Sequence, residues 1–375
     1  MTAPATRYLR QQILEDLKRK MVFLAGPRQV GKTTLALGLP GAPKGYLNWD
    51  IAEDRERILR RELPTNDLLI LDEIHKYRRW RDWLKGIYDA QVRGPRRRIL
   101  VTGSARLDYY RYSGDSLQGR YHLLRLHPLS VAELGIEATA DLEQLLQLGG
   151  FPEPFFSGSK TEARRWSREH RNLMIREEVS SFERVQDLGS LELLALRLPE
   201  LVGSPLSLNA LREDLQVTHK TVANWVAILE RMYSVFRLPP FGHPRLRAIK
   251  KANKHYHFDW SLVGDRAARF ENLVASHLLK WVHHQQDIAG RDLELRYFRD
   301  TDGREVDFLV TEARHPILLV EAKLSGAKVD RSLKYLSQRF PDARAWQLCL
   351  DDSKDFETPE GLRVAPAAEL LRELV

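Results

Sequence analysis

The sequence predicts an α/β protein with several domains, and three features support this prediction. Its 375 residues are 43% hydrophobic, which is enough to form the cores of two or three domains. Over the first third of the chain, short apolar runs alternate with helical patterns, as in a parallel sheet covered by helices. A helix–turn–helix pattern and a second group of strands follow, which predicts two further domains.

Each element follows from a local pattern of apolar residues. The predicted strands of the first part are 21–25, 46–49, 67–71, 98–102 and 121–126, and its helices are 12–20, 33–39, 77–91 and 141–148. The later helices are 207–215, 218–232 and 266–283, and the later strands are 234–238, 293–299, 304–311 and 317–323. Asp300-Thr301-Asp302-Gly303 is a hairpin turn signal between two of these strands.

These patterns divide the chain into four segments. Residues 1–150 form a parallel-sheet domain that ends at the breaker Gly149-Gly150-Phe151-Pro152. The remaining segments are a helical lid or linker over 151–200, a winged helix–turn–helix over 201–255 and a second α/β domain over 256–375.

Composition excludes several classes of protein. The single cysteine, Cys349, excludes a disulfide framework and a cysteine-based zinc site. No apolar run approaches the length of a membrane span, and the first residues lack the apolar core of a signal peptide. We therefore expect a cytoplasmic protein without a membrane partner. The net charge of +8 indicates a polyanionic partner if the charge is clustered.

The strongest motif is a phosphate-binding loop. GPRQVGKT, which begins at Gly26, matches G-x-x-x-x-G-K-[ST] between a predicted strand and a predicted helix. Its backbone N–H groups can surround phosphates, Lys32 neutralises the β- and γ-phosphates, and the Thr33 hydroxyl ligates Mg²⁺. The expected nucleotide-binding residues are Gly26, Pro27, Arg28, Gln29, Val30, Gly31, Lys32, Thr33 and Thr34.

Two further strand ends carry residues suited to nucleotide hydrolysis. The strand LLIL precedes Asp72, which is expected to hold Mg²⁺, and Glu73, which is expected to polarise the attacking water. The strand ILVT ends in Thr102, and Ser104 follows shortly. Either Thr102 or Ser104 can sense the γ-phosphate or the water.

An arginine before the last predicted strand of this domain suits a role at a neighbouring subunit. Arg120 can stabilise charge in the transition state at the neighbour's nucleotide. Arg106, Arg111 and Arg125 are alternatives.

Residues from about 12 to 180 resemble the AAA+ ATPase superfamily through GPRQVGKTT, LLILDEIHKYRRW, ILVTGSARLD and SLQGRYHLLRLHPLS. More closely, the chain resembles prokaryotic AAA-type ATPases fused to a C-terminal domain of unknown function, through GGFPEP, FDWSLVGDRAARFENLV and REVDFLV. This resemblance implies a P-loop AAA+ domain that uses ATP rather than GTP. It also implies homo-oligomers, with a hexamer favoured, and nucleotide at the subunit interfaces. Many members have an asparagine sensor where this chain offers Thr102 or Ser104.

The helix–turn–helix pattern indicates contact with DNA. Lys220, Thr221 and Asn224 lie mostly off the apolar stripe near the start of the second helix, where recognition helices contact bases. The segment 241–254 contains no acid and adds Arg245, Arg247, Lys250, Lys251 and Lys254, which can follow phosphates. The alternative is a winged helix that only packs against protein.

A second basic cluster lies in the first domain, at Arg78, Arg79, Arg81 and residues 93–98, with Trp80 and Trp83 interleaved. It indicates either a surface that faces DNA or a subunit interface.

The last domain contains carboxylates in apolar strands. Glu321 and Lys323 share a strand face, and Asp307 joins them if its strand pairs as a hairpin. With Glu271 on the preceding helix, this set resembles the PD-(D/E)xK nuclease superfamily, which implies Mg²⁺ bound by carboxylates and a lysine that acts on the water. The alternative is a degenerate nuclease fold that binds or assembles.

Together these features predict an ATP-hydrolysing AAA+ protein that acts on DNA, such as branched or recombination intermediates, with a nuclease-like C-terminal domain. Two alternatives remain: a nucleotide-dependent switch or adaptor with an inactive nuclease-like domain, and a structure-specific nuclease gated by ATP.

Overall fold

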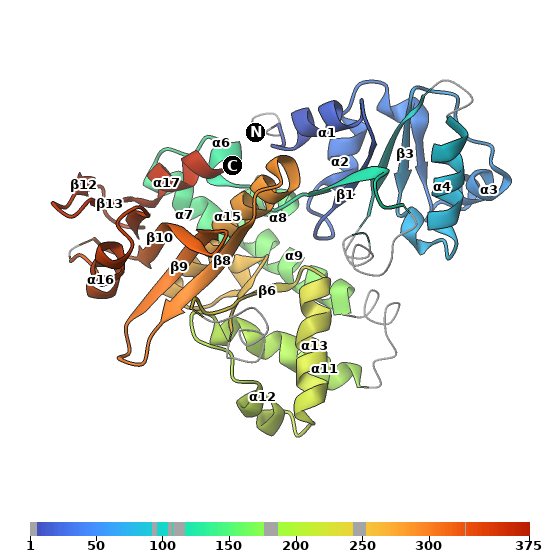
Figure 1. Ribbon diagram of the computed structural model, residues 1–375. Coiled ribbons are helices and arrows are strands. Elements are labelled where there is room, and N and C mark those ends of the chain that lie inside the picture. The colour runs from blue at the N-terminus through green and yellow to red at the C-terminus, as the bar shows by residue number, and fades with distance from the viewer. Residues whose placement is uncertain are drawn as a thin grey trace. The chain divides into compact units, whose positions relative to one another are not determined.

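The computed structural model describes residues 6–91, 96–103, 107, 117–175, 187–242, 253–326 and 328–375 (Figure 1). The chain divides into two compact units, residues 2–128 and residues 129–375.

The first unit contains the predicted parallel sheet. Its strands are β1 (Met21–Ala25), β2 (Tyr46–Asn48), β3 (Leu68–Asp72), β4 (Arg98–Thr102) and β5 (Tyr121–Arg125). All of them run parallel in the order β2-β3-β4-β1-β5. The order places β4 between β1 and β3, so three strand ends with polar residues are neighbours. The prediction of a parallel sheet is confirmed.

Helices cover both faces of this sheet. The helices are α1 (Arg10–Asp16), α2 (Lys32–Leu37), α3 (Ala52–Arg60) and α4 (Trp80–Ala90), with 3₁₀ turns η1 (Ala42–Gly45) and η2 (Ile74–Lys76). Phe23 and Val101 form a core with Ile58 of α3 and with Trp80 and Leu84 of α4, while α1 and α2 contact β1 and β4. Every residue of β1 and β3 is buried, as expected for strands covered on both faces.

The second unit begins with a group of helices. They are α6 (Val131–Leu134), α7 (Thr139–Leu148), α8 (Pro152–Ser157), α9 (Lys160–Leu173) and α11 (Leu188–Arg197), followed by the 3₁₀ turn η6 (Leu198–Leu201). Ser159 begins α9, and its hydroxyl accepts the N–H of Glu162 as an N-terminal cap.

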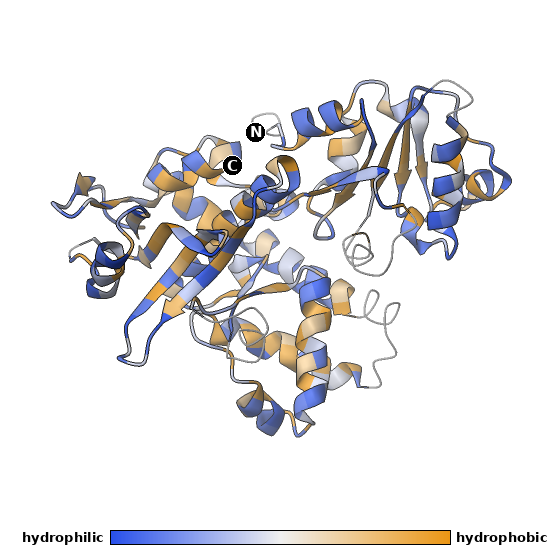
Figure 2. Cartoon of the chain, viewed as in Figure 1, coloured by the Kyte–Doolittle hydropathy of each residue, from blue (hydrophilic) through white to orange (hydrophobic). Residues whose placement is uncertain are grey.

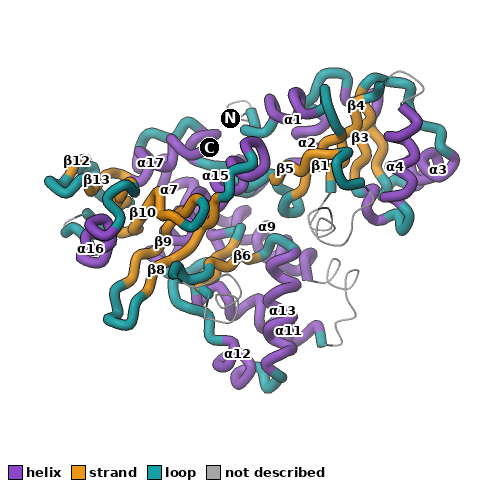
Figure 3. Tube along the Cα trace, in the orientation of Figure 1, coloured by secondary structure: helices purple, strands orange, loops and turns teal. Residues whose placement is uncertain are grey.

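A helix–turn–helix follows and leads into a small sheet. Its helices are α12 (Leu208–Asp214) and α13 (His219–Arg231), and its strands β6 (Val235–Leu238) and β7 (Lys254–His257) pair antiparallel (Figure 3). Ser207 and Thr218 cap the two helices, as the sequence predicts. The apolar residues of α13 form a core with α11 and α12.

The rest of the second unit is a six-stranded mixed sheet in the order β12-β13-β11-β10-β9-β8. Its strands are β8 (Leu293–Arg299), β9 (Glu305–Glu312), β10 (His315–Lys323), β11 (Arg344–Cys349), β12 (Phe356–Glu357) and β13 (Leu362–Pro366). The turn η7 (Trp260–Leu262) and the helix α15 (Arg266–Ala289) precede the sheet, and α16 (Arg331–Arg339) and α17 (Ala367–Leu374) pack on its strands. The predicted hairpin β8–β9 is present, and β9 and β10 also pair antiparallel, which is the condition for Asp307 to join Glu321 and Lys323. In Figure 2 the strands of the parallel sheet are mostly hydrophobic, whereas those of the six-stranded sheet contain both hydrophobic and hydrophilic residues.

Candidate functional site

The phosphate-binding loop leaves the carboxyl end of β1 in a conformation that requires glycine. Gly26 has φ 150°, and a Cβ there would lie 2.3 Å from the carbonyl oxygen of Leu126. Gly31 has φ 98°, in the left-handed region that disfavours other residues. The two glycines of the motif are therefore fixed by the backbone path, which turns sharply before α2.

Lys32 lies inside this loop. Its side chain is buried, and its ammonium donates to the carbonyl oxygens of Gly26 at 3.0 Å and Pro27 at 2.6 Å. These two hydrogen bonds hold the positive charge of Lys32 within the loop, where the sequence motif predicts that the phosphates of a nucleotide bind.

Asp72 is the meeting point of three hydroxyl groups. Its Oδ2 accepts from Thr33 and from Tyr46, both at 2.8 Å, and its Oδ1 accepts from Thr102 at 2.5 Å. The strand register explains the meeting, because Asp72 is aligned with Thr102 on β4 and with Asn48 on β2. The carboxylate is thus fixed in position by hydroxyl groups from two neighbouring strands, β2 and β4, and from Thr33 of the loop motif.

Tyr46 was not among the residues expected at this site. Burial, and then the hydrogen bond to Asp72, raise the pKa of its hydroxyl, so it stays a donor at neutral pH. An aromatic residue in a short edge strand gives no sign of this role in the sequence.

The oxygens at this edge of the sheet fit Mg²⁺. The Thr33 hydroxyl and the Asp72 carboxylate are hard oxygen ligands, and Mg²⁺ commonly takes only one or two ligands from protein and the others from phosphate and water. Over the described ranges, no group of three or more His, Cys, Asp and Glu residues is placed to hold a metal by itself. A site of this kind would therefore be completed by a nucleotide.

Glu73 follows Asp72 in a left-handed backbone conformation, with φ 56°. Its N–H donates to the carbonyl oxygen of Thr102, and its carboxylate lies 3.4 Å from Lys76 Nζ and 3.5 Å from His75 Nε2. Lys76 also contacts Asp50 at 2.5 Å. Burial raises the pKa of Glu73, so its carboxylate accepts a proton more readily than the carboxylate of an exposed glutamate does.

Arg120 lies at the opposite edge of the sheet. Its carbonyl oxygen accepts from the N–H of Met21, at the start of β1, and its guanidinium pairs with Asp89 at 2.8 Å. A role at this subunit's own loop is therefore not favoured by the geometry. Of the other candidates, Arg125 is buried, whereas Ser104, Arg106 and Arg111 lie outside the described residues.

The basic cluster of the first unit is not aromatic at its surface. Trp80 and Trp83 are buried in the core on α4, so they add no aromatic surface to this cluster, whether it faces DNA or a neighbouring subunit. Arg78 and Arg79 are exposed, and residues 92–95 lie outside the described ranges.

The helix–turn–helix presents its polar residues away from its core. Lys220 and Asn224 are exposed and Thr221 is half-buried, while Val222 and Val226 are buried. Arg245, Arg247, Lys250 and Lys251 all lie outside the described residues.

The carboxylates of the last domain do come together. Lys323 Nζ lies 2.6 Å from Glu321, which accepts the N–H of Asp307 at 3.1 Å. Asp307 in turn accepts the N–H of Ala322. Burial and the nearby Asp307 raise the pKa values of both Glu271 and Glu321.

Lys254 is in the centre of this cluster, which corrects its assignment to a basic loop. It is the first residue of β7 and is 1% exposed. Its ammonium lies 2.7 Å from Glu305, 3.1 Å from Glu271 and 3.3 Å from Asp307. Burial alone would lower the pKa of Lys254, but the three carboxylates together raise it, so Lys254 stays charged and acts as their counter-ion. Tyr256 adds a hydrogen bond to Glu271 at 2.6 Å.

The parallel sheet, the glycine-dependent loop and the Thr33–Asp72 pair define an AAA-type P-loop ATPase domain. In agreement, residues 18–135 match the family described as AAA domain. Residues 139–272 and 266–370 match two families described as domains of unknown function, DUF8612 and DUF4143.

Two relatives extend over most of the chain. Uncharacterized protein Rv2008c of Mycobacterium tuberculosis and Uncharacterized protein Mb2031c of Mycobacterium bovis are each 24% identical over 355 residues, covering 88% of this chain and 78% of the relative.

Solved structures give weaker likenesses. A RuvB structure from Thermotoga maritima has a TM-score of 0.31 at 18% identity, covering 62% of this chain and 89% of its own. A structure titled replication initiator DnaA bound to AMPPCP and single-stranded DNA has a TM-score of 0.30 at 15% identity, covering 61% and 89%. TM-scores this low do not establish a shared arrangement of the whole chain. Among the helices that the structure describes, none combines the length and apolar character needed to cross a bilayer.

Proposed function

We propose that this chain is a Mg²⁺-dependent ATPase that acts on DNA. The observation that carries the proposal is the position of Asp72, which accepts hydrogen bonds from Thr33 of the loop and Thr102 of the neighbouring strand. These contacts place a carboxylate and a hydroxyl beside the loop that holds Lys32, which is the arrangement that ATP hydrolysis requires.

The roles of the residues follow from their positions. Lys32 and the backbone of residues 26–31 would bind the β- and γ-phosphates. Thr33 and Asp72 would hold Mg²⁺, which would neutralise charge on the phosphates. Glu73 orients the attacking water and accepts its proton. In this reaction Thr102 is a positioning residue, because its hydroxyl is bound to Asp72.

Action on DNA is supported by charge and by the helix–turn–helix. The net charge is +8, and α13 presents Lys220 and Asn224 to solvent near its start. A homo-oligomer, with a hexamer favoured, would place Arg120 at the nucleotide of a neighbour. In that arrangement DNA binding and ATP turnover would be coupled through subunit contacts.

The test is steady-state ATP hydrolysis with single-stranded, duplex and branched DNA, together with mass measurement with and without ATP. The proposal predicts turnover that requires Mg²⁺ and rises when DNA is added. Strand displacement or branch migration would distinguish a motor from a nucleotide-dependent switch. Mg²⁺-dependent turnover that no DNA changes would contradict the part of the proposal that concerns DNA.

For the C-terminal domain, one observation favours a nuclease-like fold that does not cleave. Lys254 contacts Glu271, Glu305 and Asp307, so an ammonium group takes the place at which carboxylates of a nuclease hold a cation. This domain would then serve in binding or in assembly of the protein rather than in cleavage of DNA.

Incubation of wild type and D307A with linear, circular and branched DNA in Mg²⁺ or Mn²⁺ tests this reading. We expect both proteins to leave the DNA intact. Cleavage by wild type that D307A loses would contradict it and would favour the structure-specific nuclease.

A further inference from the structure

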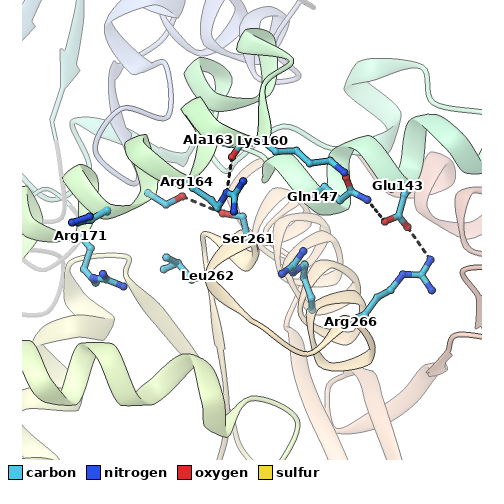
Figure 4. A pocket seen from close by; sticks show the side chains of 12 residues that line it. Glu143, Gln147, Lys160, Ala163, Arg164, Arg171, Ser261, Leu262 and Arg266 are labelled. Atoms are coloured by element: carbon cyan, nitrogen blue, oxygen red, sulfur yellow. Dashed lines mark hydrogen bonds and ion pairs between the residues drawn. The ribbon is translucent and has the colours of Figure 1, made fainter.

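A pocket of about 550 Å³ lies within the second unit, away from the carboxylate cluster. Its walls come from α7, α9, η7 and the start of α15 (Figure 4). We call it the α9 pocket, because α9 supplies half of its lining, namely Lys160, Ala163, Arg164, Ser167, Arg168 and Arg171.

The α9 pocket is strongly cationic. Its lining includes one lysine and five arginines but only one acid, Glu143. Glu143 is already paired with Arg266 at 2.9 Å, and Arg266 also pairs with Asp351 at 2.6 Å. Glu143 therefore forms its ion pair with Arg266, and among the described residues it forms none with the other cations of the lining.

Five cations of the lining have no ion pair with any residue that the structure describes. They are Lys160, Arg164, Arg168, Arg171 and Arg269. Arg164 and Arg269 donate only to backbone carbonyl oxygens, those of Lys160 and Val263. Burial lowers the pKa of Arg171, the nearby Asp259 raises it, and the positive charge of Arg168 lowers it, so the two arginines repel each other. An anion in the pocket would relieve this repulsion.

The cations of α9 form a row. Positions 160, 164, 168 and 171 share one face of the helix and extend over about 16 Å along its axis. A row of separate positive charges suits several phosphates in succession better than one compact anion. Arginine also binds phosphate oxygens through two parallel N–H groups.

The apolar part of the lining is small and contains no aromatic ring. It consists of Ala163 and Leu262. A nucleotide base would therefore find nothing to stack on, although bases are commonly bound by stacking on aromatic side chains. This favours recognition of phosphates without recognition of a base. A duplex is too wide to enter a hollow of this volume, whereas a single strand can follow it.

We propose that the α9 pocket binds the phosphodiester backbone of single-stranded nucleic acid. This inference rests on the proposed action on DNA and assigns part of that contact to a surface outside the helix–turn–helix.

The helix itself provides a matched control. Arg165 is adjacent in sequence and equally positive, but it is not in the lining and pairs with Glu162 at 3.2 Å. Replacing Arg165 by glutamine changes the net charge of the same helix by one unit without changing the pocket. The variants are therefore R164Q/R168Q and R165Q, each in the full chain.

The measurement is fluorescence anisotropy of a labelled oligothymidylate, titrated with each protein at several salt concentrations. We expect R164Q/R168Q to bind roughly tenfold or more weakly, with a salt dependence that is shallower by about 0.7 for each lost phosphate contact. R165Q should bind within about twofold of wild type. An abasic oligonucleotide should bind like oligothymidylate, because the pocket recognises the backbone.

Three results would overturn the inference. If R164Q/R168Q binds the oligonucleotide as tightly as R165Q, the pocket is not a contact, although the proposed function stands. If wild type binds no nucleic acid, both the pocket and the DNA-directed function fail. If only inorganic tripolyphosphate is bound in a manner that depends on Arg164 and Arg168, the occupant is a free polyphosphate. Unchanged melting temperature and unchanged binding of fluorescent ATP in both variants would show that the fold and the loop are intact.

Discussion

The hydroxyl of Thr33 donates to Asp72 across 2.8 Å, although the two residues are separated by 39 positions in the sequence. The parallel sheet brings them together, because β1, which precedes the loop, and β3, which ends in Asp72, have their carboxyl ends on the same side of the sheet with only β4 between them. One residue belongs to the phosphate-binding loop and the other lies at the end of a strand. Their contact links the two motifs before any ligand binds.

Replacing Glu73 by glutamine should separate binding from hydrolysis. The variant keeps the size of the side chain but cannot accept the proton of the attacking water, so we expect turnover to fall by about 10²–10⁴-fold. ATP binding should stay near wild type, and ATP should remain bound after a chase. Normal turnover in E73Q would remove Glu73 from the reaction.

Replacing Thr102 by valine should affect both stability and turnover. The Thr102 side chain is fully buried and donates to Asp72 at 2.5 Å, so T102V leaves a carboxylate oxygen without this donor at a cost of about 1–3 kcal/mol. T311V is the matched control, because Thr311 is equally buried in β9 and its hydroxyl has no hydrogen-bond partner among the described residues. Denaturant unfolding and ATPase rates should show losses in T102V and little change in T311V. Equal effects in both variants would argue against a special role of the Asp72 contact.

Replacing Lys254 by methionine should strongly destabilise the second unit. Removing one partner of a buried ion pair typically costs about 3–5 kcal/mol, and Lys254 has three carboxylate partners. K334M removes an exposed ion pair with Glu360 and should cost less than about 1 kcal/mol. Chemical unfolding followed by tryptophan fluorescence compares the two. A K254M protein as stable as K334M would contradict the counter-ion role.

The loss of stability in K254M should also depend on pH in a definite direction. Burial raises the pKa values of Glu271 and Glu321, so the folded state binds protons that the unfolded state has already released. This contribution to stability is present at low pH and is lost as pH rises through the folded-state pKa values. Without Lys254 the carboxylates are harder to ionise, and the stability difference between wild type and K254M should grow from pH 5 to pH 8. A difference that shrinks over this interval would contradict the assignment.

Replacing Arg120 by alanine tests its action on a neighbour. R120A should bind ATP but lose turnover, and mixing it with E73Q should restore part of the activity, since each protein supplies what the other lacks. D89N is the control, because it removes the ion pair of Arg120 but keeps the arginine. An inactive mixture, or equal loss of turnover in D89N, would argue against an arginine that acts in trans.

The first unit could be predicted closely because the sequence patterns that mark its elements are local. Apolar runs marked β1 and β4 at the residues where the structure has them, and the loop motif fixed the position of Lys32 and Thr33. The meeting of Tyr46 and Asp72 could not be predicted, because it depends on which strands are neighbours. Strand order is a property of the whole sheet.

The error at Lys254 has a different cause. The residue follows a run of arginines and lysines, so its charge suggested a solvated loop. In the structure it begins β7, which pairs with β6, and its side chain points toward the carboxylate cluster. The residues around Lys254 in the sequence give no information about its partners Glu305 and Asp307, which lie on β9. The last elements, such as α16 and β11, were also not predicted, although Leu333 and Leu336 of α16 help to form the core.

The central claim is that ATP is hydrolysed at the loop of Lys32, and one measurement tests it most directly. It is the steady-state rate of phosphate release with Mg²⁺ and single-stranded DNA for wild type, K32A and K44A. Lys44 is an exposed lysine of η1 and serves as the control. The account predicts turnover in wild type and K44A and none in K32A. Equal turnover in K32A and wild type would contradict it.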